Sequence, residues 1–555
     1  MHGLLPSLRC RDVRSARRAR NTPYCIIRDP SAKFDTNAAE VNRYPLVAVQ
    51  QFPRNAYGEP AMKHARLLLF GLFLISVVVR LPGLNRPVSK HHEFNTAFFL
   101  IPMEIWEKEG LVQHGFIPPY NYFSSNDKYI AEPIGIEAGN KDGTYYYLSI
   151  PSLSYLVPYG IFQLLHLPPS PLGLRLFNLC LHLLLCLMLF EVLAKLFPVR
   201  AALLGTVFHL FSPGTLWFHG NGYTHHIFAA FLVVAALYAL SLILFSTKRN
   251  AWHLLFYTAT LFLLFLTEWI SVFFALTVML VMFIHRKRVP ASRAVIGCSI
   301  AAAAFGLGLL LFQYAHYIGL EHYFAYQRGR LGWRSTWSGP SSLLAQGTAW
   351  LKWTIVSFGP WIVFIAALGG WALLLRKQGA RPAPALQNVF LLLVLIPALL
   401  YHLTFGQFTM EHDYAVMIDA LGWAFLLALL IAGTPIRRRS IAVAVAGVAA
   451  LGIAQYFYIN RPGAYGQNGD PYTIYQDIGE TIRRTSTPED TIFITGFDAS
   501  VNRNNPQVMY YAKRNFKPVD NVEEALDFLH SHHRLKGKLY VLKGGKVEGI
   551  HTLNP

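Results

Sequence analysis

Hydrophobic residues gather in long runs along this chain, separated by polar connections. A run of about 20 apolar residues is the length that an α-helix needs to cross a bilayer. The runs lie near residues 65–79, 172–194, 200–217, 226–245, 252–267, 270–284, 294–317, 347–375, 388–404, 414–432 and 441–459. The pattern predicts a polytopic α-helical membrane protein with about eleven spans, several of them short.

One further run, residues 150–166, is shorter and is interrupted by Pro151 and Pro158. Its placement decides the topology, because Lys and Arg are enriched in cytoplasmic connections. If this run does not cross, the basic connections fall on one side, namely Lys195 and Arg200, Lys248 and Arg249, Arg286–Arg288, Arg376 and Lys377, and Arg437–Arg439. We therefore expect a re-entrant or surface segment here. The N-terminus is then cytoplasmic, in a multi-pass protein of the cell (cytoplasmic or inner) membrane.

The large first outer loop, residues 81–171, lies on the extracytoplasmic side in this topology. Within it Phe94, Phe98, Ile101 and Ile105 recur at helical spacing, which predicts an amphipathic helix on the membrane surface. The same side receives clusters of histidines and carboxylates, namely His92, Glu93, His225, His226, Glu268, Glu411, His412 and Asp413. We interpret this side as the working face.

The two ends of the chain differ from the apolar middle, residues 62–460. Residues 1–61 are polar and Arg-rich without sustained periodicity, which predicts a disordered basic extension. Met62 stands directly before the first apolar run, so we hypothesise that the upstream part is a mis-called start. Residues 461–555 read as helices and strands in alternation, with helices at 471–485, 505–514 and 521–532 and strands at 491–495 and 538–542. This predicts a small extracytoplasmic α/β domain.

Composition supports the membrane assignment. The chain is 53% hydrophobic and only 14% charged, whereas soluble domains carry about 25% charged residues. Its formal net charge of +19 is expected to mark cytoplasmic connections, so no nucleic-acid partner is predicted. The five cysteines form no C-x-x-C pair, so neither a disulfide framework nor a thiolate metal site is indicated.

The stretch Lys90-His91-His92-Glu93-Phe94-Asn95 opens the polar part of the first outer loop. A carboxylate beside imidazoles can take a proton from a hydroxyl or hold a metal ion. A lone glutamate in a loop is more often simply solvated. The place of Glu93 at the mouth of an apolar bundle is what favours a chemical role.

Four features resemble the GT-C class of membrane glycosyltransferases. The first span ends in Arg80-Leu81-Pro82-Gly83 and precedes a large outer loop with an acidic motif. Residues 146–153 (YYLSIPSL) stand in the place of the family's His-Pro-Pro-Leu segment, and residues 174–178 (LRLFN) match the family's Arg-Leu-Phe-Asn. A small soluble domain follows the last span. Over residues 62–460 the architecture is similar to dolichyl-phosphate-mannose protein mannosyltransferases and lipid A aminoarabinose transferases. His92-Glu93 replaces the Asp-Glu often found there, which leaves the base and the metal requirement open.

The resemblance implies transfer of a hexosyl or pentosyl group from a polyprenyl-phosphate donor to a hydroxyl of a protein, glycolipid or cell-envelope glycan, with inversion. Glu93 then matches the base or cation holder. Arg175, and Arg330 in the outer loop, would bind the donor phosphate, although Arg175 could instead snorkel to the interface and Arg330 could be solvated. His92, Glu411, His412 and Asp413 would bind or orient substrate. A divalent metal, if one binds, would have Glu93 and His92 as ligands.

Two other classes remain as alternatives. A transporter predicts ionisable residues near the bilayer midplane and repeated halves, whereas this chain has few mid-span charges and no internal repeat. A non-catalytic envelope scaffold would not require polar clusters on the face of the first loop. The pair His225-His226 fits no fixed metal spacing, so we expect a hydrogen-bonded role for it rather than a metal site.

Overall fold

The computed structural model describes residues 59–88, 92–122, 140–141, 144–220, 222–245, 250–287, 289–337, 341–376, 385–433, 438–460, 473–497, 505–534 and 536–554. Nearly all of the predicted N-terminal extension lies outside these residues, as do Lys90, His91 and Asn221. Several basic residues of the predicted cytoplasmic connections, among them Lys248, Arg288 and Arg437, also lie outside them.

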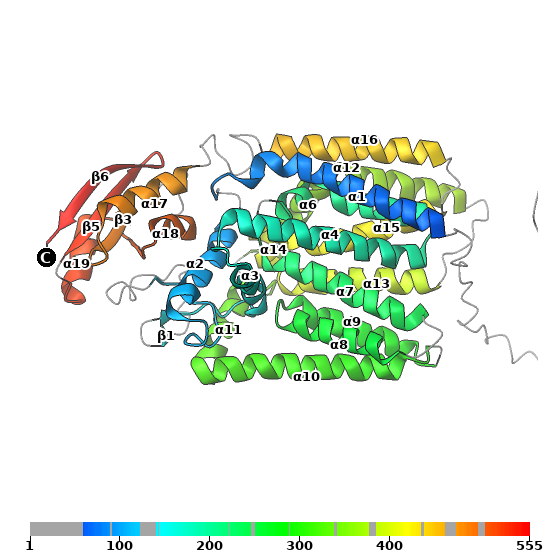
Figure 1. Cartoon of the computed structure of the whole chain (residues 1–555), viewed down its shortest axis with the longest axis horizontal. Coiled ribbons are helices and arrows are strands. Elements are labelled where there is room, and N and C mark those ends of the chain that lie inside the picture. Colours follow the sequence, from blue (N-terminus) through cyan, green and yellow to red (C-terminus); the bar gives the residue numbers. More distant parts are fainter. Residues whose placement is uncertain are drawn as a thin grey trace, which may run out of the picture. The chain divides into compact units, whose positions relative to one another are not determined.

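Apolar helices of membrane-crossing length form the main body of the protein (Figure 1). Among the described residues, eight helical segments are long and apolar enough to cross a membrane. They comprise α1 (Glu59–Leu84), α4 (Pro171–Leu196), α7 (His225–Phe245), α10 (Ser292–Tyr317), α12 (Leu343–Arg376), α13 (Ala385–Thr404), the 3-10 helix η2 (Asp413–Ile418) with α15 (Asp419–Gly433), and α16 (Arg438–Ile459). Three shorter apolar helices are α5 (Val199–Phe211), α8 (Ala251–Phe265) and α9 (Ile270–Ile284). Each matches one apolar run of the sequence, which confirms a polytopic helical membrane protein.

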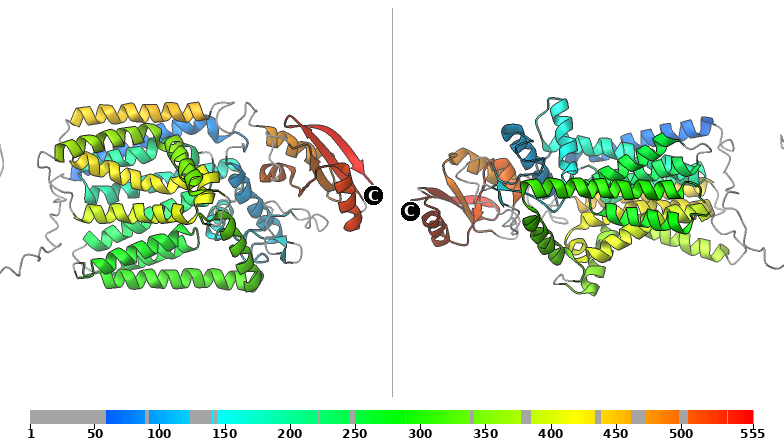
Figure 2. Two further views of the ribbon diagram at one scale, coloured as in Figure 1. Left: turned by 180° about the vertical axis from the view of Figure 1, so that it is seen from behind. Right: turned by 90° about the horizontal axis from the view of Figure 1, so that it is seen from below.

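The helices differ in how much protein covers them. In α7, 72% of the residues in the apolar window are buried, against 28% in α1, α10, α12 and α16. A helix that is apolar all round and buried all round belongs inside a bundle. Figure 1 accordingly shows α10 and α16 along opposite edges of the bundle, and the left view of Figure 2 shows the same from behind.

Short helices gather at one end of the bundle, which we name the loop end. These are α2 (Phe94–Glu109), α3 (Leu153–Leu164), α6 (Pro213–Phe218), α11 (Leu320–Arg334) and α14 (Gly406–Glu411) (Figure 1). A two-residue hairpin, β1 (Asn140–Lys141) with β2 (Thr144–Tyr145), also belongs to the first loop. Helix α3 has 12 residues, or about 18 Å, too short to cross a hydrocarbon core of about 30 Å. This agrees with the expected surface segment.

Two elements of the loop end differ from the sequence expectations. Helix α2 forms as predicted, but Ala97 and Leu100 are buried as well as Ile101 and Ile105. Protein therefore surrounds α2, because it packs against α3, α4 and the C-terminal helix α18 (Pro506–Ala512). Arg330, expected in an outer loop, lies instead on the helix α11, which buries Tyr323, Tyr326 and Arg330 on one face.

The C-terminal part is a small α/β region, as predicted. Its further helices are α17 (Ile474–Thr485) and α19 (Val522–Ser531), and its strands are β3 (Thr491–Thr495), β4 (Lys517–Pro518), β5 (Gly537–Lys543) and β6 (Lys546–Leu553). The strand order is β4-β3-β5-β6, with β3 parallel to β4 and β5 and with β6 antiparallel to β5. The sequence reading missed β4 and β6. The domain boundaries 1–61, 62–460 and 461–555 stay a prediction, and α1 already begins at Glu59.

Candidate functional site

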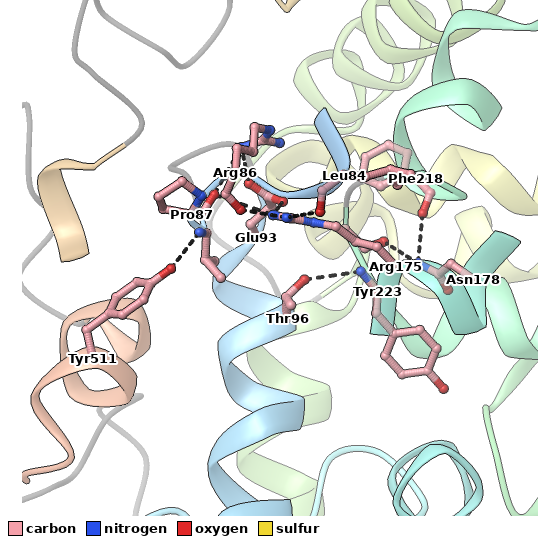
Figure 3. A network of polar contacts seen from close by, with 12 residues as sticks. Leu84, Arg86, Pro87, Glu93, Thr96, Arg175, Asn178, Phe218, Tyr223 and Tyr511 are labelled. Atoms are coloured by element: carbon pink, nitrogen blue, oxygen red, sulfur yellow. Dashed lines mark hydrogen bonds and ion pairs between the residues drawn. The ribbon is translucent and has the colours of Figure 1, made fainter. Parts of the chain in front are cut away.

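Glu93 lies at the start of α2 and is fully buried at the loop end. Its Oε1 accepts a hydrogen bond from Arg175 Nη2 at 2.9 Å, and its Oε2 accepts one from Arg86 Nη1 at 2.6 Å (Figure 3). A buried carboxylate is costly unless it is paired, and hydrogen bonds to guanidinium groups are among the strong ones. The two arginines therefore hold Glu93 ionised and fixed in orientation. Glu93 is therefore not a solvated loop residue.

Arg175 lies in the second turn of α4, which begins with Ser170 accepting a hydrogen bond from Gly173 N at 3.1 Å. While its Nη2 donates to Glu93, its Nη1 donates to the backbone carbonyls of Leu84 at 2.8 Å and Arg86 at 2.6 Å. Arg175 thus ties the end of α1 to the segment that carries Glu93 (Figure 3). The side chain is buried rather than snorkelling to the surface. Its predicted role in donor-phosphate binding stays a prediction.

The turn before α7 closes over this pair. Asn178 Nδ2 donates to the carbonyls of Phe218 and Gly222, both at 3.3 Å, and Tyr223 N donates to Thr96 Oγ1 at 3.2 Å (Figure 3). A Cβ on Gly222 would lie 3.9 Å from Glu93 Cγ. This turn therefore lies in van der Waals range of the carboxylate side chain.

His92 and Asp413, both predicted site residues, come together across the loop end. His92 Nε2 lies 3.0 Å from Asp413 Oδ1. The His92 backbone has φ of 51°, a left-handed conformation that non-glycine residues adopt mostly at turns and functional sites. His412 stacks on His92 with ring centroids 5.8 Å apart. Burial, followed by the nearby His92 and Arg334, holds the pKa of His412 well below its usual value, so His412 is neutral at pH 7. Glu411, also predicted, accepts from Gln407 Nε2 at 2.8 Å.

Arg330, which is buried, and Arg334, which is partly buried, are two cations one turn apart on α11. Arg330 Nε donates to Ser149 Oγ at 2.7 Å, and Arg334 Nη2 approaches the Tyr147 hydroxyl at 3.4 Å. Although burial raises the pKa of Tyr147, Arg334 and Arg330 bring it below its ordinary value. Over the part of the chain that the structure describes, no ion pair joins either arginine to a carboxylate. Two neighbouring guanidiniums with no paired carboxylate among the described residues suit an anion such as phosphate. Of these two arginines, only Arg330 was predicted from the sequence.

A second buried polar cluster consists of His225, His226, Glu268 and Tyr401. His225 Nε2 lies 2.9 Å from Glu268 Oε2, and His226 Nε2 lies 3.0 Å from the Tyr401 hydroxyl. The Tyr401 hydroxyl donates to Glu268 Oε1 at 3.2 Å. Burial would raise the pKa of Glu268, but His225 and its other basic neighbours lower it to about 2. The hydrogen-bonded role expected for the His pair is therefore present, with Glu268 as a partner that the sequence did not assign.

The same cluster also suits a divalent metal. One ligand atom each from His225, His226 and Glu268 lie within 4.8 Å of one another. The Nδ1 atoms of both histidines are buried and accept or donate no hydrogen bond within the described residues. Two imidazoles and a carboxylate are a known zinc ligand set. By contrast, both oxygens of Glu93 face guanidinium groups, and its predicted metal role together with His92 stays a prediction.

A further His/Cys group lies inside the bundle, at His182, Cys186 and His209. Arg80 Nη2 lies 3.0 Å from His182 Nδ1. A guanidinium at this distance repels a metal cation. The group is therefore a weaker metal candidate than the cluster at Glu268.

No family model and no curated protein matches the sequence of this chain. Its structure is similar to that of ArnT from Cupriavidus metallidurans bound to undecaprenyl phosphate, with a TM-score of 0.55 and 12% identity over 85% of this chain and 92% of that one. It is also similar to the Archaeoglobus fulgidus oligosaccharyltransferase, with a TM-score of 0.50 and 14% identity over 85% and 68% of the two chains. The arabinofuranosyltransferase AftD from Mycobacteria gives a TM-score of 0.50 and 12% identity, over 86% of this chain and 35% of that one. The chain therefore has the fold of the GT-C membrane glycosyltransferases.

Proposed function

We propose that this protein transfers a sugar from a polyprenyl-phosphate donor to an acceptor hydroxyl, with inversion, on the extracytoplasmic face of the cell membrane. The observation that carries the proposal is Glu93, a buried carboxylate held between Arg86 and Arg175. The arginine pair on α11, suited to a phosphate, supports it at the same end of the bundle.

The reaction requires a base for the acceptor hydroxyl. In our proposal the hydroxyl oxygen attacks the anomeric carbon, and its proton passes to a carboxylate oxygen of Glu93. Each carboxylate oxygen has two lone pairs, so Glu93 can accept a hydrogen bond from the acceptor while it keeps its arginine partners. Arg175 then acts by orienting Glu93 and balancing its charge.

The bond between the anomeric carbon and the phosphate oxygen breaks as the new glycosidic bond forms. The electron pair of that bond leaves with the polyprenyl phosphate. Arg330 and Arg334 donate to this anion and so stabilise the developing charge. Tyr147, which lies between them, is a third hydrogen-bonding group at the phosphate.

A divalent metal, if one takes part, would be held by His225, His226 and Glu268 and would supply positive charge near the departing phosphate. Arg334 lies near enough to this cluster to lower the pKa of Glu268. The two sources of positive charge would therefore serve the same region of the site.

AftD is named an arabinofuranosyltransferase, and one ArnT structure holds undecaprenyl phosphate. Such a carrier is the donor class that we propose here. The acceptor class is a protein, a glycolipid or a cell-envelope glycan. We favour an enzyme over a transporter or a scaffold, because Glu93 with its arginines and Arg330 lie at one end of the bundle rather than along its middle.

His92 and Asp413 provide a second candidate base. The carboxylate of Asp413 lies 3.0 Å from His92 Nε2, and the His92 side chain is 17% exposed. An imidazole oriented by a carboxylate is a common proton acceptor. It is therefore the natural alternative if Glu93 proves dispensable.

The test is transfer of label from radiolabelled polyprenyl-phosphate sugars into membranes, at equal expression of each variant. Loss of transfer in Glu93→Gln with activity kept in Asp413→Asn supports Glu93 as the base. The reverse result assigns the base to His92 and Asp413. Absence of transfer by the parent protein with every donor would contradict the proposed function.

A further inference from the structure

Helix α18 of the C-terminal region contacts the segment just before Glu93. The backbone N–H of Val88 donates to the hydroxyl of Tyr511 on α18 at 2.8 Å (Figure 3). Burial raises the pKa of Tyr511 to about 12, so its hydroxyl stays protonated at neutral pH. Val88 lies two residues after Arg86, which holds Glu93 Oε2. Tyr511 therefore fixes the backbone of the segment that carries the Arg86 clamp.

The residues after α18 contact the chain beyond Glu93. Lys513 forms an ion pair with Glu104 on α2. Asn515 is fully buried, and its side chain accepts from Tyr122 N at 2.7 Å and donates to Tyr122 O at 3.1 Å. Two hydrogen bonds to one backbone residue fix both position and orientation. The tyrosine so held also donates from its own hydroxyl to Glu104 at 3.0 Å.

Residues of one short element of the C-terminal region thus contact the chain both before and after Glu93. The contact before it is at residue 88, and the contacts after it are at residues 104 and 122. Placing a reacting group within a fraction of an ångström commonly requires such support from residues that touch no substrate.

We propose that α18 and the residues directly after it form a positioning element for Glu93, in which Tyr511 and Lys513 hold the segment in its reactive arrangement. The expected effect on kcat rests on the proposed function, whereas the expected effect on the structure around Val88 does not. Tyr511 and Lys513 are positioning residues, since they act through Arg86 and α2 rather than on substrate.

The kinetic test uses the full-length protein in membranes with a labelled polyprenyl-phosphate sugar. Lys513→Glu is expected to lower kcat by about tenfold or more and Tyr511→Phe by a smaller factor, with KM for the donor unchanged. The double variant Glu104→Lys with Lys513→Glu, which restores the ion pair with its charges exchanged, is expected to regain activity. Lys543→Glu is the matched control, because Lys543 pairs with Glu548 on the exposed hairpin of the same region.

A second measurement is independent of catalysis. Val88 is fully buried, so Val88→Cys, in a background whose five native cysteines are replaced by serine, is expected to react slowly with a maleimide. Lys513→Glu should speed that labelling and the exchanged pair should slow it again. Unchanged labelling and unchanged kcat in Lys513→Glu and Tyr511→Phe would overturn the proposal. Faster labelling in a parent protein that transfers no sugar would uphold the positioning element and contradict only the proposed reaction.

Discussion

Arg175 and Glu93 are 82 residues apart in the sequence, yet the guanidinium of one lies 2.9 Å from the carboxylate of the other. The same guanidinium also donates hydrogen bonds to two backbone carbonyls, those of Leu84 and Arg86. The ion pair is therefore part of the framework that joins α1, α2 and α4. It holds a charged group in a place from which water is excluded.

Removing Arg175 is expected to take away one of the two arginines that pair with Glu93 among the described residues. Breaking a buried pair by deleting one member typically costs about 3–5 kcal/mol. Arg175→Ala should therefore lower the Tm of the detergent-purified protein. The control is Arg66→Ala, which removes an ion pair to Glu191 from a side chain that is 53% exposed, and such pairs contribute about 1 kcal/mol or less. Equal Tm values for the two variants would contradict the prediction.

Arg334→Gln should weaken use of the donor. Losing one charge-assisted hydrogen bond costs about 1.5–3 kcal/mol, or roughly 10- to 100-fold in kcat/KM for the donor. Arg328→Gln removes the same charge from an exposed position on the same helix, and we expect it to change kcat/KM little. Steady-state transfer assays with both variants decide this. If Arg328→Gln is as damaging as Arg334→Gln, general surface charge and not a phosphate site explains the effect.

Acid should destabilise the protein through Glu268. Its pKa is about 2 in the folded protein against an ordinary value of 4.5, so folding favours the ionised form. This stabilisation is complete above about pH 4.5 and is lost as the pH falls toward 2, by at most about 3 kcal/mol. Thermal unfolding of parent and Glu268→Gln between pH 6 and about pH 3 measures it. The Tm difference between them should shrink on acidification, and a constant difference would refute this account.

Zinc is expected to bind at the cluster of His225, His226 and Glu268. The measurement is metal content after incubation with zinc and desalting, which does not depend on turnover. His226→Ala should lose bound zinc, while Glu93→Gln should retain it. Retention by His226→Ala together with loss from Glu93→Gln would move the metal to the ligands first predicted from the sequence.

The spans were predictable because hydrocarbon thickness sets a length that apolar runs reveal directly. The strands β3 and β5 were predictable because each is a short run of mostly apolar residues, β-branched and aromatic in β3 and Leu539–Leu542 in β5. Strand β6 was missed because Gly549 interrupts its short run and most of the strand is exposed at the edge of the sheet.

The site was only partly predictable. Glu93, Arg175 and His92 were found from their place relative to the first span and from a family resemblance. The approach of His92 to Asp413 joins segments that no local periodicity relates. Helix α11 was missed because its composition is polar and Gly-containing, and its burial depends on tertiary contacts such as that of Arg330 with Ser149. Arg86 was not predicted as a site residue, because a single basic residue after a span usually lies at the membrane interface.

The contact of Tyr511 with Val88 joins residues 423 positions apart. At about 5–20 residues per second, a ribosome needs roughly 20 to 85 seconds to travel from one to the other. The segment that carries Glu93 therefore emerges long before the helix that holds it has been made. Membrane insertion of the bundle can proceed before α18 exists, so under the proposed function a nascent chain would reach full activity only after α18 has been synthesised and docked. Translation itself would then time the onset of activity.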